Sequence, residues 1–210
     1  GLCFTPDYIL ITAYSEDRKN LGSLMVFDRE SGEYLVTLGM KKESHLGGIA
    51  FDGENVWICH SNSNTLERIS YEYITKIAQD APEYCIDASA LSDEYRLKNT
   101  PSCITCYGGR LWVATHTRFF DSEMYSYDKK EDKLTAVSNY NLPSKVQGVA
   151  FDDNGSIYLS TSYGRNNSSY LKVYSSLLSL DKKPNEPKVK VEMPPCSEEV
   201  AIADGTVFVL

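Results

Sequence analysis

The sequence is poor in the features that usually reveal an enzyme. Its 210 residues contain no GxSxG elbow, no HExxH zinc motif, no P-loop and no dinucleotide-binding fingerprint, and only three histidines. These absences exclude the enzyme classes that depend on those motifs. They leave open whether the protein is an enzyme at all.

Basic residues are scarce as well. Lys and Arg number 21 against 29 Asp and Glu, which gives a net charge of −8. Nucleic acids and anionic membranes both need a basic footprint, so we expect neither as the main partner. No apolar run approaches the roughly 20 residues that span a bilayer, so we expect no direct membrane insertion.

The two ends of the chain carry no targeting segment. The sequence begins in a strand-like run, "GLCF", and ends in another, "GTVFVL". We therefore expect both ends to be cuts in a longer protein, so a missing signal peptide says little about localisation.

The six cysteines do not form a recognisable framework. Cys103 and Cys106 have a CxxC spacing, but no second CxxC or adjacent Cys/His pair accompanies them. The two lie in an apolar strand pattern, where a free cysteine behaves as a small hydrophobe. We expect buried structural thiols here, with a metal or redox site as the weaker alternative.

What the sequence does contain is an internal repeat. Five similar segments begin near residues 1, 48, 103, 148 and 199: "GLCFTPDYILI", "GIAFDGENVWI", "CITCYGGRLWV", "GVAFDDNGSIYL" and "EVAIADGTVFVL". Each reads as an apolar strand, a turn rich in Asp, Gly or Asn, and a second strand. The spacing matches the roughly 40–50 residues of a four-stranded propeller blade.

The remainder of each repeat fits the same unit. Third strands are predicted in "SLMVFDRESG", "TLERIS", "EMYSYDKKED" and "SYLKVYS", and fourth strands in "EYLVTLG", "KLTAVSN" and "KVKVEMP". The second repeat is longer, and part of "ISYEYITKIAQDAPEYCIDASALSDEYRLKN" is predicted to be helix, with a Ser-x-x-Glu box near Ser92 to Tyr95. We predict an all-β single domain over 1–210, a β-propeller of four-stranded antiparallel blades with a helical insertion. Five blades is the direct interpretation, and six or more would need sequence beyond the ends.

The repeats resemble the broad superfamily of gluconolactonase/regucalcin-like and NHL-like propellers. More narrowly, "HLGGIAFDGENVWIC", "VQGVAFDDNGSIYLSTSYGRNNSSYL" and "EEVAIADGTVFVL" resemble uncharacterised bacterial propeller proteins, many of them exported. The resemblance implies the propeller fold and favours an extracytoplasmic or secreted protein. It carries no catalytic residue to a position here, because the metal-binding Glu and Asn/Asp set of the lactonase-like branch has no complete equivalent.

Propeller geometry predicts where a site would lie. Loops that enter the first strand of a blade and loops that join its second and third strands share one face of the ring. The candidate ligand-binding residues at this channel mouth are Tyr14, His45, His60, His116, Arg118, Gln147, Tyr163, Arg165, Glu198 and Glu199. Imidazole, guanidinium and carboxylate groups around one mouth suit a polar ligand or acid–base work. The alternative is that these loops are polar because they lie in water.

Alignment of the repeats separates the candidates. His60 and His116 fall in adjacent columns, and successive strand residues point to opposite faces, so a three-histidine metal site is disfavoured. Glu198 fills the slot that Gln147 fills in the preceding repeat. The two side chains either bind a cation or hydroxyl-rich ligand or bond to one another. Arg165 either pairs with Glu198 or faces a ligand with it.

The recurrence of the tryptophans points away from ligand binding. Trp57 and Trp112 share one column of the alignment, which indicates packing between blades.

Two function classes follow. The first is a non-enzymatic module that binds a small polar ligand, a glycan or a protein and belongs to an exported or cell-envelope protein. It has no resident metal or cofactor. The second is a hydrolase or lyase that acts on a sugar acid, lactone or polysaccharide, with a divalent cation such as calcium at the channel mouth near Glu198.

Overall fold

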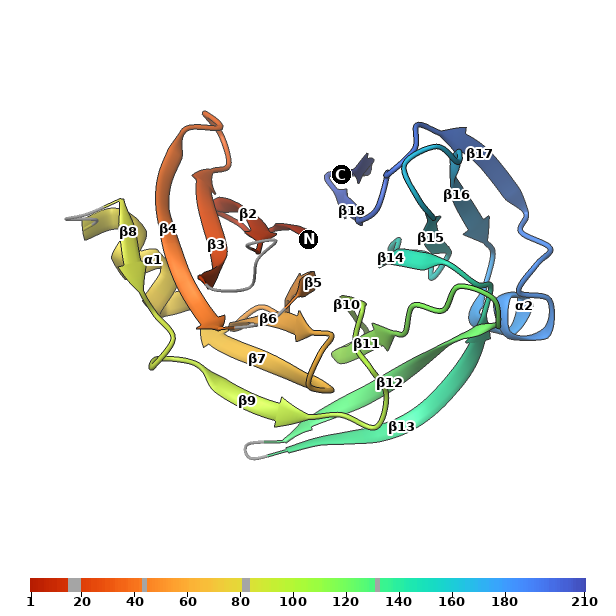
Figure 1. The fold of residues 1–210 in the computed structure, drawn as a ribbon, viewed down its shortest axis with the longest axis horizontal. Helices are drawn as coiled ribbons and strands as arrows, with labels where there is room; N and C mark the ends of the chain where they lie inside the picture. The colour runs from red at the N-terminus through yellow and green to blue at the C-terminus, as the bar shows by residue number, and fades with distance from the viewer. Residues whose placement is uncertain (15–19, 43–44, 81–83, 131–132) are drawn as a thin grey trace.

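The repeats fold into five small antiparallel sheets arranged in a ring, which confirms the predicted β-propeller (Figure 1). The computed structural model describes residues 1–14, 20–42, 45–80, 84–130 and 133–210. Among these residues, no helix is long and apolar enough to cross a membrane.

Four of the sheets are full blades, and each predicted repeat begins one sheet. Blade 1 contains β1 (Leu2–Phe4), β2 (Tyr8–Ala13), β3 (Leu21–Asp28) and β4 (Tyr34–Lys42). Blade 2 contains β5 (Leu46–Phe51), β6 (Asn55–His60), β7 (Thr65–Ser70) and β9 (Asp93–Arg96). Blade 3 contains β10 (Cys103–Tyr107), β11 (Arg110–Ala114), β12 (Ser122–Lys130) and β13 (Lys133–Leu142). Blade 4 contains β14 (Val146–Phe151), β15 (Ile157–Thr161), β16 (Ser169–Tyr174) and β17 (Val189–Met193).

The fifth sheet has two strands, β18 (Val200–Ala203) and β19 (Thr206–Val209). Strand β18 contacts β14 of blade 4 on one side and β1 of blade 1 on the other. The innermost strands β1, β5, β10, β14 and β18 therefore form a closed ring around the channel.

The insertion in the second repeat differs in part from the prediction. A helix is present, α1 (Tyr71–Asp80), and it contacts both β4 and β7 while burying Ile74 in the core. The chain then adds β8 (Cys85–Asp87) as a parallel strand on β4 of blade 1 before it returns to blade 2. The predicted Ser-x-x-Glu helix start is wrong, because residues 93–96 form β9, the outer strand of blade 2, paired with β7.

Three apolar clusters join successive blades. The first lies between blades 1 and 2, the second between blades 2 and 3, and the third between blades 3 and 4. Trp57 is buried in the second cluster and Trp112 in the third. Both tryptophans thus have the packing role that their shared column predicted, because alternate residues of a strand face the neighbouring blade. A second helix, α2 (Leu177–Lys182), buries Leu180 in the third cluster and contacts β13 and β16.

Close contact between the inner strands depends on glycine. A Cβ on Gly148 would lie 2.5 Å from the Val200 nitrogen, and a Cβ on Gly48 would lie 2.7 Å from the Cys103 Cα. Backbone atoms cannot move aside as a flexible side chain can, so these positions accept no larger residue. The repeated glycine that marks the start of the inner strand in the sequence is therefore a packing requirement of a narrow ring.

The hairpin turns contain a buried acid as well as glycine. The Asp52 carboxylate accepts hydrogen bonds from the Asn55 backbone N–H at 2.7 Å and from the Trp57 indole at 2.8 Å. Lys129 of β12 donates to the same carboxylate at 2.6 Å. Burial acts to raise the pKa of Asp52, but these hydrogen bonds outweigh it and hold the pKa below its usual range. One turn residue thus links blade 2 to blade 3.

Candidate functional site

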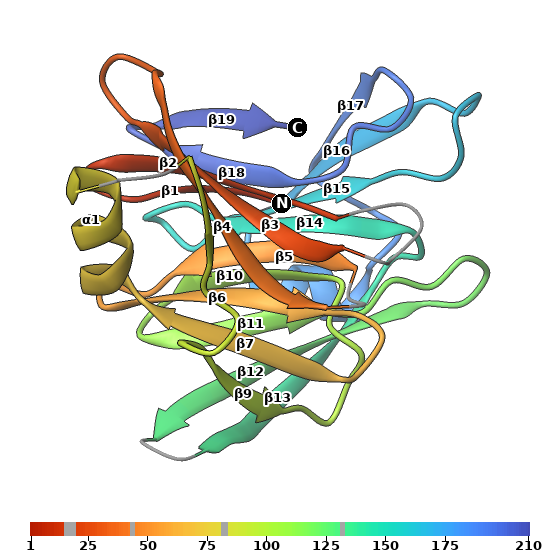
Figure 2. The ribbon, with the colours of Figure 1, turned by 60° about the vertical axis from the view of Figure 1, so that its left-hand side comes forward.

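The loops chosen from the sequence project from one face of the ring. Figure 2 shows the β11–β12 loop and the β15–β16 loop extending from the same side of the molecule. The inner strands begin at this side, which we call the mouth. The mouth-facing loops are therefore the ones that the sequence predicted, although their side chains do not form a single site.

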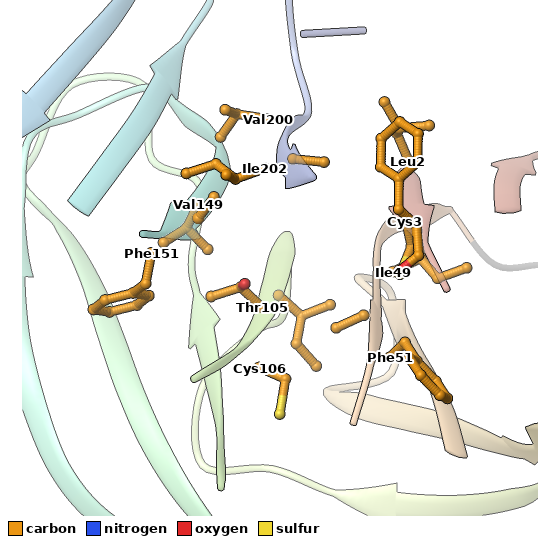
Figure 3. A pocket seen from close by; sticks show the side chains of 15 residues that line it. Leu2, Cys3, Ile49, Phe51, Thr105, Cys106, Val149, Phe151, Val200 and Ile202 are labelled. Atoms are coloured by element: carbon orange, nitrogen blue, oxygen red, sulfur yellow. The ribbon is translucent and has the colours of Figure 1, made fainter. Parts of the chain in front are cut away.

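The channel itself is small, and none of the described residues that line it carries a charged side chain. It has a volume of about 150 Å³ and is lined by three residues from each of the five inner strands, of which Figure 3 labels ten. The Thr105 hydroxyl and the thiols of Cys3 and Cys106 are the polar side-chain groups among these residues. A channel of this size falls below the range of about 300–1,000 Å³ that is usual for small-molecule sites.

Glu199 is the one acidic candidate that is buried. It is 3% exposed, and its Oε1 accepts a hydrogen bond from the Val200 N–H at 3.3 Å. Its Oε2 has no hydrogen-bond partner among the described residues. Burial raises the pKa of Glu199 to about 8, although the positive charge at the Gly1 nitrogen opposes the rise.

The surroundings of Glu199 place it near the centre of the ring. Burial first and the Glu199 charge second raise the pKa of the Cys59 and Cys103 thiols. These thiols belong to blades 2 and 3, so the carboxyl group lies within electrostatic reach of sheets that are distant in the sequence. Alignment of the repeats favoured the preceding residue, Glu198, which the structure leaves exposed.

Arg165, Gln147 and Glu198 are not paired with one another among the described residues. Among the ion pairs formed by described residues, none joins Arg165 to Glu198, and Arg165 is exposed at the tip of the β15–β16 loop. Gln147 is partly buried, and no hydrogen bond between it and Glu198 is found in the same part of the chain. The alternative that Arg165 and Glu198, or Gln147 and Glu198, face a ligand together stays a prediction.

The three histidines occupy three separate environments. The His45 ring packs on the exposed Tyr14 ring, with centroids 4.3 Å apart. His116 donates from Nδ1 to the Val146 carbonyl oxygen at 3.1 Å. His60 is buried inside blade 2, where its Nε2 donates to the Glu67 carboxylate at 2.6 Å.

The His60 contact is part of a closed network. Glu67 is fully buried, and its other carboxylate oxygen accepts a hydrogen bond from the Ser92 hydroxyl. A buried carboxylate needs such partners, and here they come from β6 and from the residue before β9. His60 thus joins strands of one blade and is buried, and its place among the ligand-binding residues stays a prediction.

The described residues contain no set of side chains that could serve as metal ligands. Within the described ranges, no three His, Cys, Asp or Glu side chains lie close enough together to hold an ion. Glu198 and Glu199 do not supply a pair of ligands either, since one is exposed and the other buried. The cation-dependent alternative thus gains no support from the arrangement of these side chains.

Two of the predicted residues do come together on blades 3 and 4. The Arg118 guanidinium lies 5.7 Å from the Tyr163 ring centroid, and Lys145 Nζ lies 5.2 Å from the same centroid. The Lys145 N–H donates to the Thr117 carbonyl at 2.8 Å, which fixes the loop before β14 against the β11–β12 loop. Tyr163 therefore carries a cation from each of two blades.

Tyr163 also lines a basic recess, a cleft of about 540 Å³ on blade 4. We call it the lysine cleft. It is formed by Ser144, Lys145, Thr161, Ser162, Tyr163, Asn167, Ser168, Tyr170, Lys172 and Lys190. Its volume falls within the range of about 300–1,000 Å³ that is usual for small-molecule sites.

The charges of the lysine cleft are unbalanced. None of the ion pairs among the described residues involves Lys145, Lys172 or Lys190. The acid nearest in the hydrogen-bond network is Glu192 of β17, which accepts from the Ser168 hydroxyl at 2.5 Å. Among the described residues of this acidic chain, three neighbouring lysines thus have no acidic partner in an ion pair.

Sequence reasoning did not find these lysines. Lys172 and Lys190 lie directly opposite one another in the pairing of β16 with β17. Lys145 lies one residue before β14. The only signal in the sequence was the charged residue inside each of the strand patterns "SYLKVY" and "KVKVEM". Their convergence depends on the register of two strands and on a loop, and periodicity alone does not give it.

Comparison with known proteins supports the fold alone. No family model and no curated protein matches the chain. Among solved structures it is similar to the glutaminyl cyclase of Myxococcus xanthus, with a TM-score of 0.65 and 12% identity over 100% of this chain and 83% of that one.

Two further structures have the same architecture and other functions. A chain of the nidogen/laminin complex has a TM-score of 0.56 and 14% identity, with 100% of this chain and 70% of that chain covered. The WD40 domain of Toxoplasma gondii coronin has a TM-score of 0.55 and 8% identity, with coverage of 100% and 63%. These neighbours are all β-propellers with different roles, so the fold does not select a function.

Proposed function

We propose that this propeller is a binding module for a small anionic ligand, which it holds in the lysine cleft of blade 4. The observation that carries the proposal is the set of three lysines, Lys145, Lys172 and Lys190, that line one cleft without an acidic partner. Mutual repulsion of like charges is unfavourable, and an anion bound among them would offset it.

The uncharged lining of the cleft suits the same ligand. The hydroxyls of Ser144 and Ser162 can donate to phosphate or carboxylate oxygens, and so can the second hydrogen of the Asn167 amide, whose first is donated to the Tyr163 carbonyl. Ligand pockets commonly combine a few convergent polar groups with aromatic walls, and Tyr163 and Tyr170 supply the walls here.

The wider expectations remain proposals. A non-enzymatic module that binds a polar ligand, a glycan or a protein is consistent with the propeller fold of the neighbours. An exported or cell-envelope location is supported by the resemblance to bacterial propeller proteins. The cysteines point the other way. All six are free and two of them are exposed, whereas an oxidising compartment favours disulfides. Cell fractionation of the source organism tests the location directly.

The binding proposal is tested by titration with inorganic phosphate and with acetate. A ligand that binds only the folded protein raises its stability by about 2.7 kcal/mol at a hundred times its Kd. We expect the melting temperature to rise with anion concentration at constant ionic strength. Lys190→Met keeps the apolar stem and removes a charge that holds the anion, so it should abolish the rise.

Lys76→Met is the matched control, because Lys76 is an exposed lysine of α1 outside the cleft. It should leave the anion-dependent rise unchanged. If wild type and Lys190→Met respond equally to both anions, the proposal is wrong.

A further inference from the structure

The three lysines of the cleft differ in what offsets their charge. Lys190 Nζ lies 3.8 Å from the centroid of the Tyr170 ring, and Lys145 Nζ lies 5.2 Å from that of Tyr163. Attraction to the face of an aromatic ring stabilises the protonated amine. No ring contact or ion pair of this kind is found for Lys172 among the described residues, so its charge is the least compensated of the three.

Lys172 also lies beside a buried apolar residue of the blade. In the pairing of β15, β16 and β17, it lies between the buried Leu159 on one side and Lys190 on the other. Residues directly opposite in a sheet share a face, so Lys172 faces the cleft with a core residue beside it. Burial first, and then the charges of Lys190 and Lys145, lower the pKa of Lys172.

The other charged group of this face does not restore the balance. Glu192 lies opposite Tyr170 in the β16–β17 pairing, two residues from Lys190, and accepts a hydrogen bond from the Ser168 hydroxyl. It forms no ion pair with the cleft lysines in the described part of the chain. A half-buried amine between two cations and without a carboxylate is the arrangement that favours a neutral, nucleophilic lysine.

We propose that Lys172 forms a Schiff base with a small carbonyl compound that also bears an anionic group, such as a 2-oxo acid. The inference rests on the proposed anion-binding function and deepens it. Lys190 and Lys145 hold the anion, and this places the carbonyl carbon at the Lys172 amine.

The step balances without any further reactant. The neutral Lys172 Nζ forms a bond to the carbonyl carbon. The carbonyl oxygen takes up one proton from solvent in the open cleft, and the attacking nitrogen releases one proton to solvent; the second nitrogen proton leaves later with the hydroxyl group as water. The resulting carbinolamine loses water, and a C=N bond replaces the C=O bond. Amine and carbonyl thus give imine and water, with no oxidant or reductant.

Reductive trapping tests this inference. The protein is incubated with pyruvate at neutral pH, reduced with sodium borohydride, digested and mapped by mass spectrometry. We expect one dominant adduct, on Lys172. The labelling rate should exceed that of the exposed Lys76, because a lowered pKa leaves a larger fraction of the amine neutral at neutral pH. Inorganic phosphate should slow the labelling by competing for the anion site.

Two variants separate this inference from the proposed function. Lys172→Arg keeps a cation in the cleft but forms no Schiff base, so it should still bind phosphate while the adduct is lost. Lys76→Met should behave as wild type in both assays. Adducts spread over surface lysines, or undiminished total labelling of Lys172→Arg, would overturn the Schiff-base inference. In that case, phosphate binding that still depends on Lys190 would leave the proposed function standing, and absent phosphate binding would remove both.

Discussion

The buried carboxyl group of Glu199 makes the stability of the ring depend on pH. Its pKa rises from the ordinary 4.5 to about 8 in the folded protein, because burial penalises the charged form. Below pH 4.5 the group is protonated in both states and has no effect on stability. Between pH 4.5 and about 8 the unfolded chain releases this proton while the folded chain keeps it, so stability falls as pH rises. Above about 8 both states are ionised and the loss is complete.

The size of the effect follows from the same values. One pKa unit corresponds to about 1.4 kcal/mol, so the full loss amounts to at most about 5 kcal/mol. Between pH 6 and pH 8 the expected change is about 2–3 kcal/mol. That is a large part of the roughly 5–15 kcal/mol by which domains are stable.

Glu199→Gln removes the titration and keeps the shape of the side chain. Urea unfolding at pH 6, 7, 8 and 9 gives the free energy of unfolding of both proteins, and the comparison cancels all other titrating groups. We expect the free energy of unfolding of the variant, relative to that of the wild type, to rise by about 2–3 kcal/mol between pH 6 and pH 8. Above pH 8 this difference should stay constant.

Glu198→Gln is the matched control for this measurement. It alters the same kind of group on the exposed neighbour, and surface substitutions usually change stability by less than about 0.5 kcal/mol. If the difference between Glu199→Gln and wild type is the same at pH 6 and pH 8, the buried carboxyl group does not titrate in this window and the reasoning fails.

Three other substitutions test the packing of the ring by urea unfolding. Asp52→Ala should lower the free energy of unfolding by about 2–4 kcal/mol, because it leaves the buried ends of several hydrogen bonds unmet, that of Lys129 among them; a loss under 0.5 kcal/mol would contradict this role. His60→Leu should cost about 3–5 kcal/mol by leaving Glu67 buried without its partner, whereas the double variant with Glu67→Leu should recover much of that loss. Gly148→Ala places a Cβ 2.5 Å from backbone and should be strongly destabilising, so a silent result would show that the inner ring can widen.

The repeat pattern predicted most of the fold because the propeller is built from local signals. Turn residues such as Asp52 and Asp152, alternating apolar strands and a recurring glycine all act within one blade. The insertion was harder to predict, since β8 and β9 are short and belong to different blades. A parallel strand added to a preceding blade leaves no periodic mark in its own sequence, because the partner strand is more than 40 residues away.

The sequence predicted which loops share one face of the ring, but it did not predict which side chains lie together there. Tyr163 was predicted as a ligand-binding residue of the channel mouth and lines the lysine cleft in the structure, while the lysines that give the cleft its charge were not predicted. The choice between Glu198 and Glu199 turned on which of two adjacent side chains the strand buries. Alignment shifts of one residue reverse that assignment, so only the structure decided it.

The lysines of the cleft, unpaired among the described residues, lower the stability of the protein, and we interpret them as residues kept for binding. The strand that carries Lys190 also carries Glu192 two residues later on the same face, so an acid was available to neutralise the cluster at little structural expense. Instead Glu192 is engaged by Ser168, and three amines remain together on the most basic recess of an acidic protein. Local arrangements that lower stability persist where function requires them. The loop of Tyr163 and Arg165, which projects from the mouth beside this cleft, then acts as its rim.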